Sequence, residues 1–210
     1  MPQVTIEGVN LRKDFAHQTI FEGISFTYRN TDSIAVTGAN GSGKSTLLRM
    51  ISGMVTITEG QIRWSLDGRK LPTHHTYEYL SFCSPGFHFD DRFTVREIIK
   101  QYCKVKPLQH GMSPDDLIGL IGFGAHSHKL ISELSSGMNQ RVRLVLTLCT
   151  QTPVLFLDEP CTNLDQQGVE WYQEMVDRFC SHKLVFVASN DPREYLFCKD
   201  QLSLMDYLVK

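Results

Sequence analysis

The sequence predicts an α/β fold built on a mostly parallel sheet. The first observation is a short apolar run, SIAVTG at residues 33–38, that ends in glycine and leads into a helical pattern. The second is a pair of apolar runs, VLFLD at 154–158 and KLVFVASN at 183–190, which are typical of strands buried on both faces. A helical pattern at residues 166–180 separates these two runs. Strands that alternate with helices in this way are typical of α/β proteins.

The composition is that of an ordinary globular protein. The chain has 210 residues, of which 41% are hydrophobic and 21% are charged, and this favours one domain with its own core. Its net charge of −2 lacks the basic excess of most nucleic-acid binders, so no nucleic-acid partner is expected. No apolar run approaches the roughly 20 residues that span a bilayer, and the first ten residues lack a secretory pattern, so a cytoplasmic location is expected.

The N-terminal region is expected to form antiparallel strands. VTIEGVNL at residues 4–11 and ISFTYR at 24–29 alternate apolar and polar residues. The pair Asp67-Gly68 separates two extended runs and is typical of tight hairpin turns. Between these strands, KSTLLRMIS at 44–52 predicts a helix that stops at Gly53.

The middle of the chain is predicted to be helical. A capping box from Thr94 to Glu97 opens one helix, and Ser113-Pro114 opens another. SSGMNQRVRLVLTLCT at 135–150 has apolar residues at helical spacing and predicts a third helix. We therefore expect a helical sub-lobe, residues 85–150, inserted between the two parts of the α/β core, residues 1–84 and 151–210.

The loop at residues 38–45 reads GANGSGKS and matches the pattern G-x-x-x-x-G-K-[ST] in full. The glycines allow a tight loop whose backbone N–H groups converge on phosphate oxygens, and the following helix points its positive dipole end at the same anion. Lys44 would add a full charge at the β- and γ-phosphates, and Ser45 would offer a hydroxyl to Mg²⁺. The motif predicts that ATP is bound by Gly38, Ala39, Asn40, Gly41, Ser42, Gly43, Lys44, Ser45 and Thr46.

Two acids, Asp158 and Glu159, end the apolar run that starts at residue 154. Ligands of parallel sheets bind beyond the carboxyl ends of the strands. Beside a phosphate loop, we expect Asp158 to hold Mg²⁺ and Glu159 to orient and deprotonate an attacking water. Lys44 and Glu159 are therefore candidate catalytic residues, and Ser45 and Asp158 are candidate metal ligands.

A third motif, LSSGMNQR at residues 134–141, resembles the LSGGQxQR signature of ATP-binding cassette (ABC) ATPases. The resemblance covers essentially the whole chain, because DEP at 158–160 and TNLD at 162–165 follow in the family's order. GVEWYQEMVDRF at residues 168–179 and FVASN at 186–190 also resemble compact bacterial ABC transporter ATPase subunits, close to the haem-exporter type. The resemblance implies a P-loop NTPase fold of the ABC ATPase type, with an N-terminal antiparallel β region and an inserted helical sub-lobe.

The same resemblance assigns three further ATP-binding residues. Ser135 would cap the helix that follows it and, with Gly137, present donors to the γ-phosphate of a nucleotide held by a second protomer. Phe15 stands where the family places an aromatic residue that stacks on adenine.

Three departures from the family pattern bear on hydrolysis. Ser136 and Met138 replace a glycine and a glutamine of the signature. Residues 62–100 contain no glutamine, although the family places one there near the metal and the attacking water, and Ser84 is the best match. Asn190 falls where the family has a histidine. Because asparagine can donate a hydrogen bond to a γ-phosphate but carries no charge, Asn190 is a candidate catalytic residue in an active but slow ATPase.

These motifs favour the ATP-binding and ATP-hydrolysing subunit of an ABC transporter. The resemblance implies ATP and Mg²⁺ as cofactors, a homodimer or a paired ATPase subunit, and separately encoded transmembrane permease subunits that hold the chain at the inner face of the membrane. Two alternatives remain open: a non-transport ABC ATPase that acts on nucleic acid or ribosomes, and a nucleotide-binding regulator with little hydrolysis. The chain lacks the long insertion or duplicated cassette typical of the first, and its Glu159 argues against the second.

Overall fold

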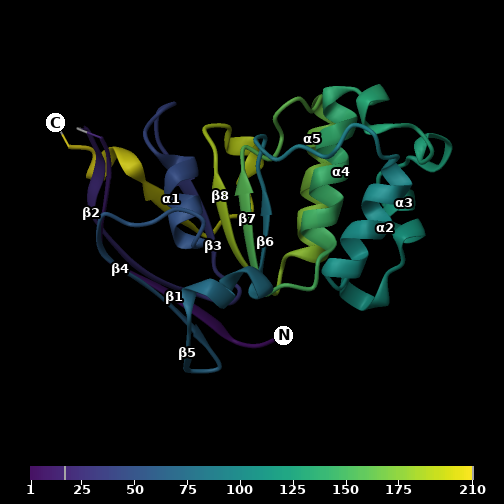
Figure 1. The fold of residues 1–210 in the computed structure, drawn as a ribbon. Helices are drawn as coiled ribbons and strands as arrows, with labels where there is room; N and C mark the ends of the chain where they lie inside the picture. The colour runs from purple at the N-terminus through teal and green to yellow at the C-terminus, as the bar shows by residue number, and fades with distance from the viewer. Residues whose placement is uncertain (17, 210) are drawn as a thin grey trace. The chain divides into compact units, whose positions relative to one another are not determined.

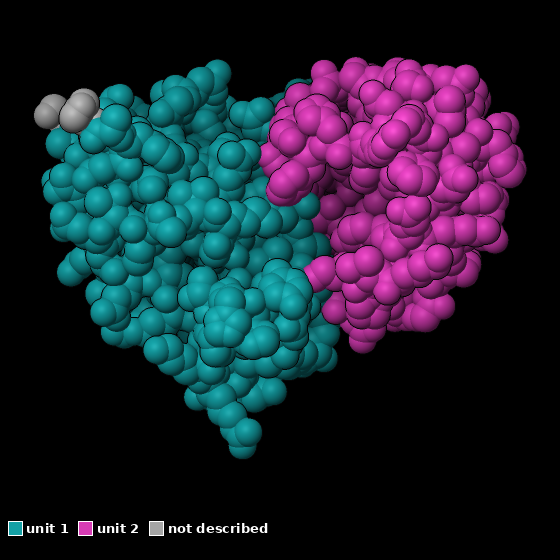
Figure 2. Space-filling view, in the orientation of Figure 1, with its two compact units in different colours: residues 1–82, 152–159, 182–210 teal, residues 83–151, 160–181 magenta. Residues whose placement is uncertain are grey.

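The structure, a computed structural model, describes residues 1–16 and 18–209. The chain forms two compact units (Figure 2). Unit 1 comprises residues 1–82, 152–159 and 182–210, and unit 2 comprises residues 83–151 and 160–181. The helical unit thus includes the segment 160–181, whereas the sequence predicts that residues 151–210 belong to the core.

An antiparallel sheet forms one part of unit 1 (Figure 1). The strand β1 pairs with both β2 and β4, and β4 continues into β5 through the Asp67-Gly68 turn. The φ angles of this turn are 48° and 77°, which is the left-handed conformation that tight hairpins require, so the predicted hairpin is confirmed. The strand order is β2-β1-β4-β5, with β1 at Val4–Phe15, β2 at Gln18–Arg29, β4 at Glu59–Leu66 and β5 at Arg69–Leu71.

The second sheet of unit 1 is mostly parallel, as the sequence predicts. Its order is β6-β7-β8-β3-β9, with β3 at Ser33–Thr37, β6 at Leu80–Cys83, β7 at Val154–Asp158, β8 at Leu184–Ala188 and β9 at Asp200–Ser203. β8 pairs in parallel with β7 and β3, and β3 pairs in parallel with β9. Every residue of β3, β7 and β8 is buried, which explains their apolar runs. β9 has no clear signal in the sequence, because DQLS contains one apolar residue.

One hydrophobic core joins both sheets to the helix α1, Lys44–Ile51. α1 packs on β7 and β8, whose residues Phe156 and Phe186 stack with ring centroids 5.1 Å apart. The indole N–H of Trp64 in β4 donates to the carbonyl of Ile51 at 2.9 Å. The core therefore fixes α1, and with it the loop that connects β3 to the N-terminus of this helix.

Unit 2 is helical, with α2 at Val95–Val105, α3 at Pro114–Leu120, α4 at Ser136–Cys149 and α5 at Gln166–Phe179. α4 packs against each of the other three helices. Thr94 with Glu97 and Ser113 with Asp116 form capping boxes, so both predicted helix starts are confirmed. The indole N–H of Trp171 in α5 donates to the carbonyl of Leu120 at 2.9 Å and ties α5 to the end of α3.

Short 3-10 helices complete the fold at Thr73–Tyr79, Gln109–Gly111, Gly124–His126, Ile131–Glu133, Pro192–Glu194 and Leu204–Tyr207. Within residues 1–16 and 18–209, no helix combines the length and the apolar character that crossing a bilayer requires.

Candidate functional site

The loop after β3 and Glu159, which directly follows β7, line one pocket in unit 1, the phosphate pocket. Parallel strands place their carboxyl ends at the same edge of the sheet, and β3 and β7 both flank β8. The pocket has a volume of about 230 Å³ and is lined by Asn40, Gly41, Gly43, Lys44, Ser45, Thr46 and Glu159.

Gly43 closes the loop against the antiparallel sheet. Its φ of 98° lies in the left-handed region, which side chains rarely adopt. A Cβ atom at this position would lie 2.6 Å from Cγ2 of Ile20 and 3.1 Å from the ring of Phe21, both in β2. Any side chain at residue 43 would therefore strain the loop where it reaches the start of α1.

Lys44 is buried within the loop, and its side chain is 6% exposed. Its ammonium donates to the carbonyl oxygens of Gly38 at 2.8 Å and Ala39 at 3.2 Å. Burial lowers the pKa of Lys44 from its ordinary value, and the carboxylates of Glu159 and Asp158 partly offset that shift. Two loop carbonyls and two nearby acids thus hold a cation at the phosphate pocket.

Ser45 and Asp158 form a pair of oxygen donors at the same place. The hydroxyl of Ser45 donates to Oδ1 of Asp158 at 2.7 Å, and Asp158 is 3% exposed at the end of β7. Mg²⁺ prefers oxygen ligands and usually takes one or two protein carboxylates together with substrate phosphates. A hydroxyl and a carboxylate in direct contact beside a phosphate loop fit this preference.

Glu159 leaves β7 with a left-handed backbone, at a φ of 46°. That conformation costs a non-glycine residue about 1–2 kcal/mol, and such residues cluster at functional sites. Its backbone N–H donates to the carbonyl of Ala188 at 2.9 Å, which continues the pairing of β7 with β8. The sharp turn brings the Glu159 residue to the wall of the phosphate pocket.

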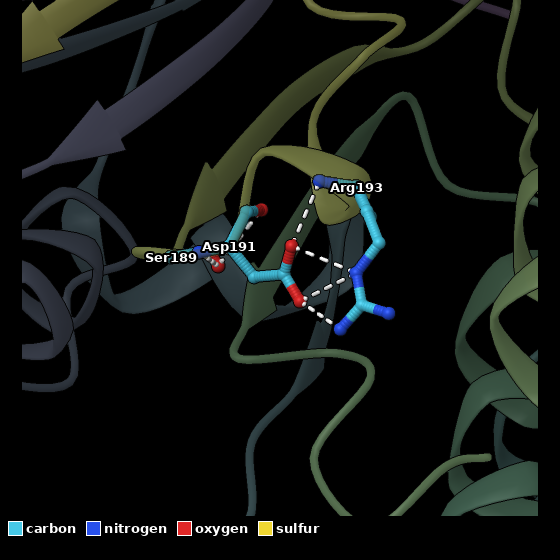
Figure 3. Close-up of polar contacts among 3 residues, drawn as sticks. All are labelled: Ser189, Asp191 and Arg193. Carbon is cyan, nitrogen blue, oxygen red and sulfur yellow. Dashed lines mark hydrogen bonds and ion pairs between the residues drawn. The ribbon is translucent and has the colours of Figure 1, made fainter. Parts of the chain in front are cut away.

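A side-chain contact ties the loop after β8 to the phosphate loop. Nδ2 of Asn190 donates to Oδ1 of Asn40 at 2.6 Å. The hydroxyl of Ser189 accepts from the N–H of Asp191, whose carboxylate accepts from Nε and Nη2 of Arg193 at 2.9 and 2.6 Å (Figure 3). Arg193 lowers the pKa of Asp191, so this carboxylate stays charged at neutral pH. Both neighbours of Asn190 are therefore held in a bonded turn.

Phe15 lies at the end of β1, and its side chain is 50% exposed. The ammonium of Lys13 lies 4.7 Å from the centroid of its ring and donates to the carbonyl of Thr56 at 2.8 Å. An exposed ring with a fixed cation nearby is suited to stacking on a flat ligand. Phe15 is not among the residues that line the phosphate pocket. The Lys13 contact had no signal in the sequence beyond the alternation of β1.

A second pocket lies in unit 2 at the N-terminus of α4, and we call it the α4 pocket. The hydroxyl of Ser135 caps the helix by accepting from the N–H of Met138 at 3.2 Å. The unpaired N–H groups of a first helical turn and the helix dipole favour an anion. The pocket has a volume of about 350 Å³ and is lined by Phe123, Ser135, Ser136, Gly137, Met138, Arg141, Asn163, Leu164 and Asp165.

Ser84, the best match for the family's glutamine, is 1% exposed, and its hydroxyl accepts from the N–H of Gly86 at 3.4 Å.

The site residues predicted from the sequence fall into separate groups. Asp158 and Asn190 join the phosphate pocket through bonds to Ser45 and Asn40. Ser135 and Gly137 line the α4 pocket.

Comparisons with known proteins agree with this arrangement. The family model for ABC transporters matches residues 21–162. The cytochrome c biogenesis ATP-binding export protein CcmA of Chelativorans sp. (strain BNC1) is 28% identical over 185 residues, which cover 86% of this chain and 88% of that protein. An uncharacterized ABC transporter ATP-binding protein of Haemophilus influenzae is 31% identical over 187 residues, which cover 87% of this chain and 74% of that protein.

The fold agrees with a solved structure of the ATP-binding cassette MJ0796, a dimer in a post-hydrolysis state bound to ADP and Pi. The TM-score is 0.79 at 19% identity, and the match covers 94% of this chain and 93% of that chain. At this level of identity the likeness establishes the fold alone. Since the family model spans more than half of the sequence and a relative above 30% identity covers most of it, this chain belongs to the ABC transporter family, among its ATP-binding proteins.

Proposed function

We propose that this chain binds and hydrolyses MgATP as the ATPase subunit of an ABC transporter. The observation that carries the proposal is the convergence at the phosphate pocket of a buried lysine, a bonded hydroxyl–carboxylate pair and a glutamate. Membrane subunits encoded separately would hold the chain at the cytoplasmic face of the membrane, and they would convert its ATP cycle into transport.

The residues in and beside the phosphate pocket have separate roles in this proposal. The loop N–H groups and Lys44 bind the β- and γ-phosphates. Ser45 and Asp158 hold Mg²⁺, which when bound neutralises charge on those phosphates. Glu159 orients a water molecule and takes its proton as the water attacks the γ-phosphate. Asn190, positioned by Asn40, donates a hydrogen bond to the γ-phosphate or to that water.

The α4 pocket completes the site of a second copy. The first turn of α4, capped by Ser135, would present N–H groups to the γ-phosphate held by the partner's phosphate loop. Two such contacts, related by two-fold symmetry, would close a dimer around two nucleotides. ATP then favours the closed dimer, and hydrolysis reopens it.

Two measurements test the proposal. Release of phosphate from ATP by the purified chain separates a hydrolase from a regulator that only binds nucleotide. Copurification of the chain with a polytopic membrane protein separates a transporter subunit from an ATPase that acts on nucleic acid or ribosomes. Absence of hydrolysis and of a membrane partner would contradict the assignment.

Ser135→Arg is expected to bind ATP normally and to fail to dimerise. A long cationic side chain at the start of α4 would occupy the α4 pocket, where the partner's γ-phosphate must enter. Gel filtration with and without MgATP measures the dimer. Ser135→Ala controls for the lost helix cap, which costs about 1 kcal/mol. Ser132→Arg controls for the added charge, because Ser132 is exposed and outside the pocket. If Ser135→Arg still dimerises with nucleotide, the α4 pocket does not receive it.

Asn190→Ala is expected to lower the maximal rate by up to about 10²-fold, the usual cost of losing one donor to a transition state. ATP affinity should stay near the wild-type value because Lys44 and the loop remain. Asn190→His should retain activity and gain a pH dependence near a pKa of about 6.5, since histidine titrates there and asparagine does not. Steady-state rates of both variants and the wild type between pH 5.5 and about 8.5 measure this. An unchanged rate in Asn190→Ala would make Asn190 a bystander.

A further inference from the structure

The backbone conformation of Gly137 does not explain why this residue is glycine. It lies in the first turn of α4, in an ordinary helical conformation that any residue can adopt. Glycine inside a helix is unfavourable by about 1 kcal/mol relative to alanine. A neighbouring group that leaves no room for a side chain would explain why residue 137 is glycine.

The neighbour of Gly137 is the backbone of the loop at residues 160–165. A Cβ atom on Gly137 would lie 2.8 Å from the carbonyl oxygen of Asn163. Contacts under 3.0 Å are essentially never made by real Cβ atoms, and a backbone oxygen cannot swing aside as the tip of a flexible side chain can. The absence of a side chain at Gly137 is what lets the loop lie on α4.

The loop has little freedom to yield. Asn163 has a left-handed backbone with a φ of 66°, and the N–H of Leu164 donates to the carbonyl of Cys161 at 2.9 Å. At its far end, Asp165 caps α5 by accepting from the N–H of Gly168 at 2.8 Å. A tight turn that leads into a helix cap is fixed at both ends.

A second contact from α4 holds the start of the same loop. Gln140 lies one turn after Gly137 and is fully buried. Its Nε2 donates to the carbonyl of Pro160 at 2.6 Å, and its Oε1 accepts from Nη1 of Arg143 at 3.0 Å. Arg143 can only donate, so its bond fixes the orientation of the Gln140 amide and turns the NH₂ group toward Pro160.

We propose that Gly137 and Gln140 are positioning residues that lock the loop at residues 160–165 onto the first turns of α4. Loop and helix together line the α4 pocket, to which the loop contributes Asn163, Leu164 and Asp165. The contacts of Gly137 and Gln140 hold the loop and the helix in one fixed arrangement. A ligand that binds at the N-terminus of α4 therefore also affects the position of the loop. The consequence for catalysis rests on the proposed function, in which the pocket receives a partner's phosphate. The contacts of Gly137 and Gln140 with the loop lie within one chain and involve no nucleotide atoms.

The test is a pair of glycine-to-alanine substitutions with opposite expected signs. Gly119 lies in α3 of the same unit with nothing within 4 Å of an added Cβ. Gly119→Ala should raise the melting temperature, because alanine is the better helix former. Gly137→Ala should lower it despite the same gain in propensity, because the new methyl group displaces the Asn163 carbonyl.

Amide hydrogen exchange of the nucleotide-free chain locates the effect. In Gly137→Ala, exchange at Leu164 and Gly168 should speed up roughly tenfold, the change that loss of about 1.4 kcal/mol of local protection produces. Gln140→Met, which keeps the volume and removes the amide, should also speed exchange in the loop. Gly119→Ala should leave it unchanged. Unchanged loop exchange in both Gly137→Ala and Gln140→Met would overturn the proposal, whatever the melting temperatures do.

Kinetic measurements distinguish a positioning role in catalysis from an effect on folding stability alone. At saturating MgATP, Gly137→Ala should lower kcat roughly tenfold and leave KM near the wild-type value, since the phosphate pocket is intact. Ile118→Val, a core change of about 0.5–1.5 kcal/mol in the same unit, should keep both constants. Faster loop exchange with an unchanged kcat would overturn the positioning role. If the wild-type chain hydrolyses no ATP, the proposed function fails, and the exchange experiment still decides whether the lock exists.

Discussion

Glu159→Gln is expected to abolish turnover while preserving ATP binding. General-base catalysis contributes about 10²–10⁴ to rate, and the amide of glutamine cannot accept the proton of the attacking water. The substitution keeps the shape of the side chain, so the left-handed turn at this residue and its backbone bond to Ala188 should persist. The loss should therefore appear in kcat and leave the fold unchanged.

The same substitution should trap the ATP-bound dimer. It removes one negative charge beside the γ-phosphate and blocks the reaction that reopens the dimer. Gel filtration should show a monomer without nucleotide and a dimer with MgATP that persists for the length of the run. Wild-type protein should return to the monomer as it hydrolyses its ATP.

Glu174→Gln is the matched control for the change of charge. Glu174 is an exposed residue of α5 and lies outside both pockets. The Glu174→Gln variant should therefore hydrolyse ATP at the wild-type rate. Equal rates for Glu159→Gln and the wild type would show that Glu159 does not take the proton of the attacking water. The mechanism proposed for the phosphate pocket would then be wrong at its central step.

Features that depend on neighbouring residues were predictable from the sequence. The helix starts at Thr94 and Ser113, the Asp67-Gly68 hairpin and the start of α1 each need only a few consecutive residues, and the structure confirms them. The buried strands β7 and β8 were predictable because strands covered on both faces require apolar runs. The strand at residues 33–37, which precedes Lys44, and the strand that precedes Glu159 were expected to end at the same edge of the sheet, and both residues line one pocket.

Contacts between distant segments were not predictable in this way. Nothing in the local sequence pairs Asn190 with Asn40, because 150 residues separate them and both side chains are exposed. The burial of Gln140 did have a signal, since Leu144 and Leu148 follow it at helical spacing and all three are buried on α4. A polar residue in line with a buried apolar stripe indicates a specific hydrogen-bond partner. The identity of that partner, the carbonyl of Pro160, depends on how the following loop folds back.

Lys44→Ala is expected to weaken MgATP binding about 10- to 100-fold. This is the loss of affinity expected when one or two hydrogen bonds to a charged group are removed. Lys44 is the cation among the residues that line the phosphate pocket, which also contains Glu159 and lies beside Asp158. Without the ammonium, the two acids would repel the β- and γ-phosphates, so the loss should exceed that of a neutral hydrogen bond. Removing the side chain also frees the carbonyls of Gly38 and Ala39, which the ammonium now bonds.

Lys70→Ala provides the control, because Lys70 is an exposed lysine of β5 in the same unit and outside the pocket. Titration of both variants with a nonhydrolysable ATP analogue and Mg²⁺ at fixed salt measures the difference, since hydrolysis then cannot distort the affinity. The melting temperature without nucleotide, measured for both variants, separates a loss of binding from a loss of folding. Unchanged affinity in Lys44→Ala would mean that nucleotide binds elsewhere. A loss of affinity accompanied by unfolding would instead assign Lys44 a structural role, as the residue that holds the loop carbonyls together.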